Sequence, residues 1–303
     1  GPLLYLTAYQ YLKAGFSIRA VLDTTDIKQI VKATFFLLPA FLNLRMIFQG
    51  FIWIKFIRKH CEFIPFVKKI KIHGKNNVSS ISLLKSNNKK KVFEIKNVFI
   101  HQGVIPNINL TMATGINHHW NSYQYCWVPT LNSFGETNLD GIYIAGDNMR
   151  IGGVKVSSTS SQLAVLDILG KLNRGFKIKK FLYFIKNLFY YSIRPFLDIL
   201  FKPSEDNILP EKSDDIVCRC ENITKSELYN SINLNVSDPN QLKAYSRAGM
   251  GKCQGRYCGL TVQAMIAKKN KIPISKVGYY NIRPPIKPIT LSELASLEKN
   301  HFD

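Results

Sequence analysis

The sequence has few acidic residues. Its 303 residues include 20 Asp and Glu against 41 Lys and Arg, which gives a net charge of +21 at pH 7. Such a charge is typical of proteins that bind polyanions. The lysines are scattered and accompany abundant Asn and Ile, however, and the chain lacks a basic stripe interleaved with aromatic residues. We therefore predict no nucleic-acid partner, and we attribute the composition to an AT-rich gene.

Long apolar runs are also lacking. A membrane-spanning helix needs about 20 nearly uninterrupted apolar residues. The apolar stretch 27–60 is interrupted by polar and helix-breaking residues, and 176–201 carries Lys or Arg every few positions. We predict packed, amphipathic helices without a membrane span, and we keep a membrane-surface role as a less favoured alternative.

The sequence shows no signal peptide and does not start with Met. Its first residues already look like the interior of a motif, so we expect a truncated N-terminus. The length is sufficient for two domains. Cys61 and Cys126 are isolated, and we interpret them as small apolar core residues of a protein from a reducing compartment, the cytoplasm.

Four cysteines stand in two pairs near the C-terminus. One residue separates Cys218 from Cys220, and residues 254–257 separate Cys253 from Cys258. Zinc sites usually leave two to four residues between paired ligands, so the first pair is too tight for that habit. A cluster of two irons, each held by its own pair of thiolates, accepts more varied spacing. The pattern favours [2Fe–2S], with zinc and a disulfide pair as alternatives.

The residues around these cysteines suit an anionic cluster. Thr224 and Glu227 form a capping-box pattern, which predicts a helix just after the first pair. A second helix is predicted to follow Cys258, and amides at a helix start favour negative charge. Three glycines surround the second pair and permit close approach of the backbone: Gly249, Gly251 and Gly255. Two basic residues, Lys252 and Arg256, add positive charge nearby.

The segment from about Val217 to Pro288, including GKCQGRYCG, resembles the [2Fe–2S]-binding domain of bacterioferritin-associated ferredoxin (BFD) type. It is similar to the version fused to FAD-dependent oxidoreductase subunits, above all the A or alpha subunits of opine oxidase, hydrogen cyanide synthase and D-hydroxyproline dehydrogenase. The resemblance implies an α/β fold, a two-dinucleotide-binding-domain flavoprotein with Rossmann-like lobes plus a small, mostly helical BFD-like domain. It also implies the cluster ligands: Cys218, Cys220, Cys253 and Cys258.

The N-terminal segment is predicted to form a helix that stops at Gly15, a strand over 16–22, and then a turn at Asp23. In a dinucleotide fold, a glycine-rich turn opens the first helix and an acidic residue about 20 positions on binds the ribose. Gly1 and Asp23 fit these two places. An ordinary helix and strand with a surface Asp is the alternative. The sequence does not decide whether this lobe binds NAD(P), another adenine nucleotide or no ligand.

Strand-like alternation continues over 63–100, with a polar hairpin tip at SNNKKK, and a further strand is predicted to end at Gly103. We interpret His101 as a structural histidine close to the crossover between lobes. The cluster His118, His119 and Trp120 has no acidic or thiol partner nearby in sequence, and we assign it to packing and surface.

The stretch Gly141–Asp147 predicts a buried strand that ends in a tight turn and a carboxylate, with a helix beginning near Val154. A carboxylate beside a helix N-terminus can hold a polyol hydroxyl while the amides hold a phosphate, as a flavin nucleotide requires. The pattern resembles the C-terminal FAD motif of such flavoproteins. An ordinary Gly-Asp turn is the alternative. The predicted FAD-binding residues are Gly146, Asp147, Gly152 and Gly153.

These patterns divide the chain into four parts. We predict a partial inserted nucleotide-binding lobe, the C-terminal part of the FAD-binding lobe, a helical connector with an exposed linker, and the BFD-like domain with an extended docking tail. Their respective boundaries are 1–100, 101–175, 176–213 and 214–303.

The chain offers no convincing acid/base constellation, so no catalytic residue is predicted. The resemblance implies an electron-transfer subunit of a dehydrogenase that oxidises a C–N bond of an amine or imino acid. A second FAD-containing, glycine-oxidase-like subunit would hold the substrate. The alternatives are an NAD(P)H-dependent flavoprotein reductase and a non-catalytic [2Fe–2S] module that senses iron or redox state.

Overall fold

The computed structural model describes residues 1–296 and divides the chain into two compact units. Residues 1–104 and 152–203 form what we call the N-terminal unit. Residues 105–151 group with the chain from 204 onward as the C-terminal unit. The four-part division stays a prediction, and each unit is described by itself.

The N-terminal unit begins with helix α1 (Pro2–Lys13), and Gly15 with φ +86° follows the helix end as expected. The strand predicted over 16–22 is shorter in the structure. It is β1 (Ala20–Leu22), which pairs in parallel with β2 (Glu62–Ile64). Tyr5 and Ala8 of α1 pack with Val21 and Ile57 to form a small core.

The stretch between β1 and β2 is helical, as predicted. It contains α2 (Ile27–Thr34), α3 (Leu37–Ala40), a 3₁₀ turn η1 (Phe41–Asn43) and α4 (Leu44–His60). By length and composition alone, Leu37–His60 could cross a membrane, with a mean hydropathy of 1.5 and 11% of its apolar window buried. One such helix is weak support for a span, because core helices of soluble proteins pass the same test.

Strands β3 (Val67–His73), β4 (Ser80–Lys85) and β5 (Lys90–Glu94) form an antiparallel sheet in that order. The predicted polar hairpin tip joins β4 to β5. Their inward side chains, with Ile64 of β2, make a second small core: Val67, Ile81, Leu83 and Phe93.

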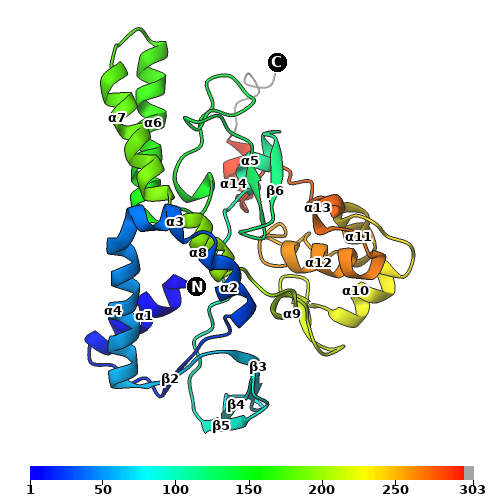
Figure 1. Cartoon of the computed structure of the whole chain (residues 1–303). Coiled ribbons are helices and arrows are strands. Elements are labelled where there is room, and N and C mark those ends of the chain that lie inside the picture. The colour runs from blue at the N-terminus through cyan, green and yellow to red at the C-terminus, as the bar shows by residue number, and fades with distance from the viewer. Residues whose placement is uncertain (297–303) are drawn as a thin grey trace. The chain divides into compact units, whose positions relative to one another are not determined.

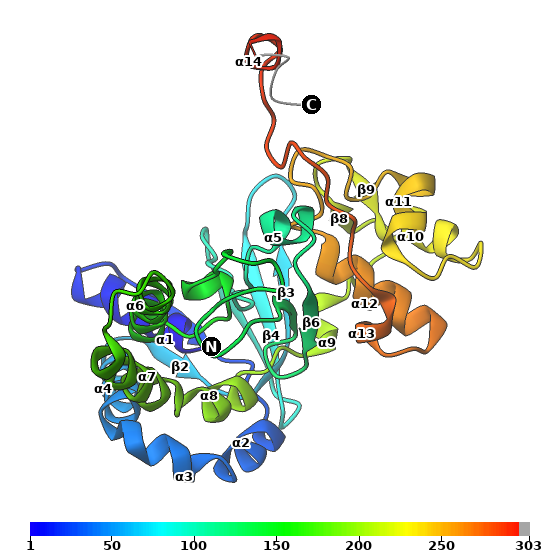
Figure 2. The ribbon, with the colours of Figure 1, turned by 90° about the horizontal axis from the view of Figure 1, so that it is seen from above.

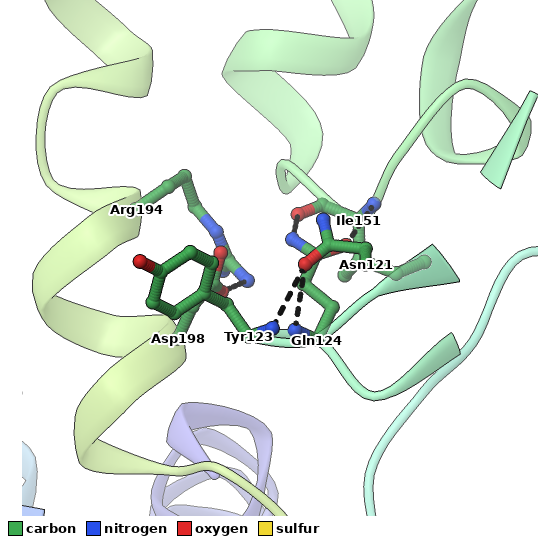
Figure 3. A network of polar contacts seen from close by, with 6 residues as sticks. All are labelled: Asn121, Tyr123, Gln124, Ile151, Arg194 and Asp198. Atoms are coloured by element: carbon green, nitrogen blue, oxygen red, sulfur yellow. Dashed lines mark hydrogen bonds and ion pairs between the residues drawn. The ribbon is translucent and has the colours of Figure 1, made fainter. Parts of the chain in front are cut away.

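Helices α6 (Val154–Lys171) and α7 (Lys177–Tyr191) lie side by side as a hairpin (Figure 1). Asn187 of α7 is buried and accepts a hydrogen bond of 2.8 Å from the Thr159 hydroxyl of α6. Helix α8 (Arg194–Leu200) follows, and its Arg194 forms an ion pair with Asp198 one turn on (Figure 3). Most of the predicted connector is thus helical, and its role as a connector stays a prediction.

The C-terminal unit combines a hairpin region with a helical domain. The first part contains α5 (Asn109–Ala113), β6 (His118–Asn121), β7 (Cys126–Pro129) and the 3₁₀ turn η2 (Gly146–Asn148). The second part contains α9 (Glu205–Ile208), β8 (Ile216–Cys218), β9 (Ile223–Thr224), α10 (Lys225–Ile232), α11 (Pro239–Ser246), α12 (Gly259–Asn270), α13 (Ile274–Val277) and α14 (Leu291–Ala295).

Helices α10, α11, α12 and α13 gather around one hydrophobic core (Figure 2). Leu228, Leu242 and Val262 are completely buried there. The predicted linker over 202–215 is not wholly exposed, because it contains α9, which packs on α12. The tail after Gly278 runs without helix or strand as far as α14, and its predicted extended course and docking stay predictions.

Two strand predictions are wrong. The chain around Gly103 forms no strand, and Phe99 and Ile100 are exposed. Gly141–Gly146 makes only an isolated bridge, between Tyr143 and Glu136. A strand needs a neighbour for its backbone hydrogen bonds, and within residues 1–296 neither segment has an adjacent strand to pair with.

Candidate metal centre

The first cysteine pair lies where β8 turns back toward β9. Cys218 ends β8 and is 1% exposed, and Cys220 follows in the turn. The turn leads directly into α10, whose start is fixed by the predicted capping box. The Glu227 amide donates to the Thr224 hydroxyl at 3.4 Å, and the Thr224 amide donates to the Glu227 carboxylate at 2.8 Å. The helix therefore fixes the position of the turn that carries the first pair.

The second pair lies on the loop that enters α12. Cys258 is the N-cap residue of α12 and is 1% exposed, and Cys253 is 5% exposed. Burial by itself would raise the pKa of the Cys253 thiol. The backbone amides of Tyr257, Gly255 and Arg256, together with Cys220, outweigh burial and lower this pKa. The loop is thus arranged to stabilise a thiolate at Cys253.

The four thiols meet in one place. Cys220 and Cys253 are within hydrogen-bonding reach of each other, and so are Cys218 and Cys258. The charge of Cys218 acts on Cys220, and that of Cys253 acts on Cys258, so the four form a closed ring of interactions. Burial, with the neighbouring Cys218, raises the pKa of Cys258. All six cysteines of the chain are free thiols.

The arrangement has the form of two pairs. In the part of the chain that the structure describes, no three His, Cys, Asp or Glu side chains come together as ligands of a single ion. A cluster with two irons is held by one pair of thiolates on each iron. Cys218 lies beside Cys258 and Cys220 beside Cys253, so each of these two contacts joins one cysteine from β8 or its turn to one from the loop.

The loop that carries the second pair approaches the first pair closely at Gly251. A Cβ atom built at Gly251 would lie 2.2 Å from the Cβ of Cys220 and 3.3 Å from its sulfur. Only glycine therefore allows the second loop to approach the first so closely. Glu221, next to Cys220, forms an ion pair of 3.0 Å with Arg247, which ties the turn to the end of α11. The four thiols, the backbone amides and this glycine cradle fit a [2Fe–2S] cluster.

The predicted flavin turn lies in the first part of the C-terminal unit. Gly146 has φ +71° and opens η2, which carries Asp147 with an exposed side chain. The segment after it is held by Gln124. The Gln124 side-chain amide donates to the Ile151 carbonyl at 2.9 Å, and the Ile151 amide donates back at 3.3 Å (Figure 3). The turn is therefore anchored in a way that the sequence does not reveal.

Gln124 is itself held by the tight turn between β6 and β7. The Asn121 carboxamide oxygen accepts hydrogen bonds from the amides of Tyr123 and Gln124, at 3.0 and 3.1 Å (Figure 3). This hairpin also contacts the helical domain, since the Trp127 indole donates to the Gln263 side chain of α12 at 3.2 Å.

The other predicted flavin residues belong to the N-terminal unit. Gly153 has φ +86° and is the N-cap of α6, which begins at Val154 as predicted. A Cβ atom at Gly152 would lie 2.5 Å from a methyl group of Val156, so only glycine fits this entry to the helix.

Gly1 is the N-cap residue of α1, and Asp23 directly follows β1. The carboxylate of Asp23 is buried, however, and already accepts three hydrogen bonds. The Tyr5 hydroxyl donates at 2.6 Å, the Thr25 hydroxyl at 2.7 Å and the Thr25 amide at 2.9 Å. These bonds give Asp23 a structural role, and its role toward a nucleotide stays a prediction.

Sequence reasoning missed several residues near the cysteines. Asn109 of α5 donates to the Gln254 carbonyl, in the loop between Cys253 and Cys258, at 3.2 Å. Tyr280 from the tail packs against the same loop and is 2% exposed. Both contacts join residues distant in sequence, so no local pattern predicts them.

Comparison with known proteins agrees with this geometry. Residues 216–268 match the family described as BFD-like [2Fe-2S] binding domain. An opine oxidase subunit of Agrobacterium tumefaciens is 35% identical over 98% of this chain and 60% of its own length. The hydrogen cyanide synthase subunit HcnB of Pseudomonas protegens is 23% identical over 96% of this chain and 64% of its own length. The chain thus spans less than two thirds of these relatives.

A solved structure shares the fold. The crystal structure of L-proline dehydrogenase from P. horikoshii superposes with a TM-score of 0.61 at 20% identity, over 81% of this chain and 48% of that one. With the domain match, this confirms the predicted α/β fold class with a BFD-like domain. The chain is therefore a homologue of this opine oxidase subunit and of HcnB with a C-terminal BFD-like [2Fe-2S] binding domain, and the resemblance predicted from the sequence is confirmed.

Proposed function

We propose that this chain is the electron-transfer subunit of a FAD-dependent dehydrogenase that acts on C–N bonds of amines or imino acids. The observation that carries the proposal is the meeting of four thiols in two pairs inside the region that matches a [2Fe-2S] domain. Opine, hydroxyproline and glycine-type compounds are the proposed substrate class. The proposed location is the cytoplasm.

The proposed cluster ligands are Cys218, Cys220, Cys253 and Cys258. A [2Fe–2S] cluster supplies one-electron transfer, which complements the two-electron chemistry of a flavin. The chain's own contribution is to hold the four sulfurs in a largely buried place. It also directs the backbone amides of Gly255, Arg256 and Tyr257 at the Cys253 sulfur, and hydrogen bonds to sulfur raise the reduction potential of such centres.

The proposed FAD-binding residues are Gly146, Asp147, Gly152 and Gly153. In the C-terminal unit, the exposed Asp147 carboxylate can accept a hydrogen bond from a ribityl hydroxyl. In the N-terminal unit, α6 begins without a side-chain cap, and helix N-termini of this kind bind phosphates. The Asn109 side chain donates to the Gln254 carbonyl, so α5 lies beside the cysteine loop within the C-terminal unit. Gly1 and Asp23 are proposed for an adenine nucleotide in the inserted lobe.

The proposed partner is a second FAD-containing subunit of glycine-oxidase type that holds the substrate. Relatives of this chain are named as subunits, which supports a hetero-oligomer. Co-expression and co-purification of this chain with a candidate glycine-oxidase-type flavoprotein test the partnership. Dehydrogenase activity that needs both chains is the expected result, and full activity of either chain alone contradicts it.

Visible spectroscopy of the anaerobically purified protein tests the cofactors. Flavin and cluster bands together, with iron and acid-labile sulfide present in equal amounts, are the expected result. Cluster bands without flavin would instead support a redox-sensing module. Bleaching of both chromophores by NADH or NADPH alone would support a flavoprotein reductase.

A further inference from the structure

Tyr280 is the most deeply buried tyrosine beside the candidate cluster. Its side chain is 2% exposed and belongs to the main core of the helical domain. Its hydroxyl is buried and makes no hydrogen bond of ordinary geometry with any residue in 1–296. Leaving a hydroxyl buried without a partner costs about 1–3 kcal/mol. A hydrogen-bond acceptor near this hydroxyl would remove that cost.

The Tyr280 hydroxyl faces the cysteines. It lies near the sulfur of Cys258 and interacts electrostatically with Cys218, the two members of one thiol pair. A phenol hydroxyl can donate a hydrogen bond, and a cysteine sulfur can accept one.

The cysteine loop is shaped around this ring. A Cβ atom at Gly249 would lie 2.6 Å from the ring carbon that bears the hydroxyl. A Cβ atom at Gly255 would lie 2.4 Å from Cδ2 of the same ring. Both glycines have positive φ, +91° and +77°. Any other residue at either position would displace the ring, so the loop fixes the direction of the hydroxyl.

We propose that Tyr280 donates a hydrogen bond to the Cys258 sulfur when this sulfur ligates the cluster, and that this bond raises the cluster's reduction potential. The bond is stronger to a sulfur that carries more negative charge, so it stabilises the reduced cluster more than the oxidised one. The inference rests on the cluster ligation proposed above. The proposed acceptor of the hydrogen bond, the Cys258 sulfur, belongs to this chain.

Tyr279 provides a matched control. It neighbours Tyr280 in sequence, and the two rings meet edge to face at 5.9 Å. Its hydroxyl lies over the start of α12, where a Cβ atom at Gly259 would approach it to 2.8 Å. Tyr279→Phe therefore removes one hydroxyl from the same region without removing the proposed donor.

The test is the reduction potential of the cluster-loaded protein, measured by titration followed by EPR. Tyr280→Phe is expected to disfavour reduction about tenfold, which is about 59 mV toward negative potential for a one-electron couple. Tyr279→Phe is expected to leave the potential near the wild-type value. Equal potentials in the wild type and Tyr280→Phe would overturn the proposal, as would equal shifts in the two variants.

A second substitution covers the case in which Tyr280→Phe fails to fold or to hold its cluster. Site-specific 3-fluorotyrosine at position 280 keeps the ring and makes the hydroxyl a stronger donor, so the potential is expected to rise. An unchanged or lower potential contradicts the proposal. Both measurements use protein whose cluster spectrum is intact. An unchanged potential then contradicts only the Tyr280 hydrogen bond, whereas failure of the proposed cysteine ligation would appear as a missing cluster spectrum.

Discussion

The helical domain of the C-terminal unit has a large, fully buried apolar core, whereas helices of the N-terminal unit leave many large apolar side chains exposed. Leu228, Leu242 and Val262 have no exposed surface. In the N-terminal unit, Phe35 is 81% exposed and Ile178 is 79% exposed. The cysteines therefore lie beside a well-packed core. Phe35 and Ile178 are among the apolar side chains of the N-terminal helices that stay largely exposed.

The largest effect on stability is expected from the core of the helical domain. Leu228→Ala should lower the free energy of unfolding by about 2–5 kcal/mol, because it leaves a cavity in a fully packed core. Phe35→Ala is the matched change in the N-terminal unit and should stay within about 0.5 kcal/mol of the wild type. Denaturant unfolding followed by circular dichroism measures both. Equal losses in the two variants would remove the contrast between the units.

Glycine substitutions sharpen the same contrast. Gly251→Ala places a Cβ atom 2.2 Å from that of Cys220, so the loop must move. A loss of about 1–3 kcal/mol is expected, together with a reduced cluster content. Gly170→Ala in α6 meets nothing within 4 Å and should stabilise its helix by about 0.5–1 kcal/mol. A Gly251→Ala protein with full cluster content would contradict the proposed cradle.

Helix caps give a smaller difference. Thr224→Ala removes the cap of α10 and should cost about 1 kcal/mol, because α10 contributes to the core beside the first cysteine pair. Thr290→Ala breaks the same capping box at α14, whose described residues are exposed. It should change the thermal unfolding of the protein less. Thr224→Ala should have the lower melting temperature of the two variants, and the reverse order would contradict the prediction.

The smallest expected effect is on the pH dependence of stability. Burial lowers the pKa of His118, whose Nδ1 donates to the Ile116 carbonyl at 2.6 Å. A histidine with a lowered folded pKa contributes stability that is present above its unfolded pKa, about 6.5, and lost as the pH falls below it. His118→Gln should therefore flatten the fall in stability between pH 7 and pH 5. An unchanged slope in that variant would assign the pH dependence to other groups.

Local signals in the sequence predicted the part of the site that depends on spacing. The capping box at Thr224, the helix after Cys258 and the helix at Val154 all follow from residues within a few positions of one another. The strand expected at Gly141–Gly146 did not form, because a strand depends on a neighbour that no local pattern supplies.

Long-range contacts explain what the sequence could not predict. The role of Tyr280 depends on Gly249 and Gly255, two residues of a loop on the far side of α12 in sequence. Gln124 anchors the Asp147 segment only because the chain returns to it at Ile151. Asp23 fits a nucleotide motif by position, yet its hydrogen bonds to Tyr5 and Thr25 come from the folded chain.

The most direct test of the proposed metal centre is the iron and sulfide content of Cys253→Ser, with Cys61→Ser as the control from the N-terminal unit. The proposed ligation predicts that Cys253→Ser loses most of its iron, acid-labile sulfide and visible cluster absorbance, while Cys61→Ser keeps all three. Wild-type content and an unchanged spectrum in Cys253→Ser would contradict the proposal that these four thiols hold a [2Fe–2S] cluster.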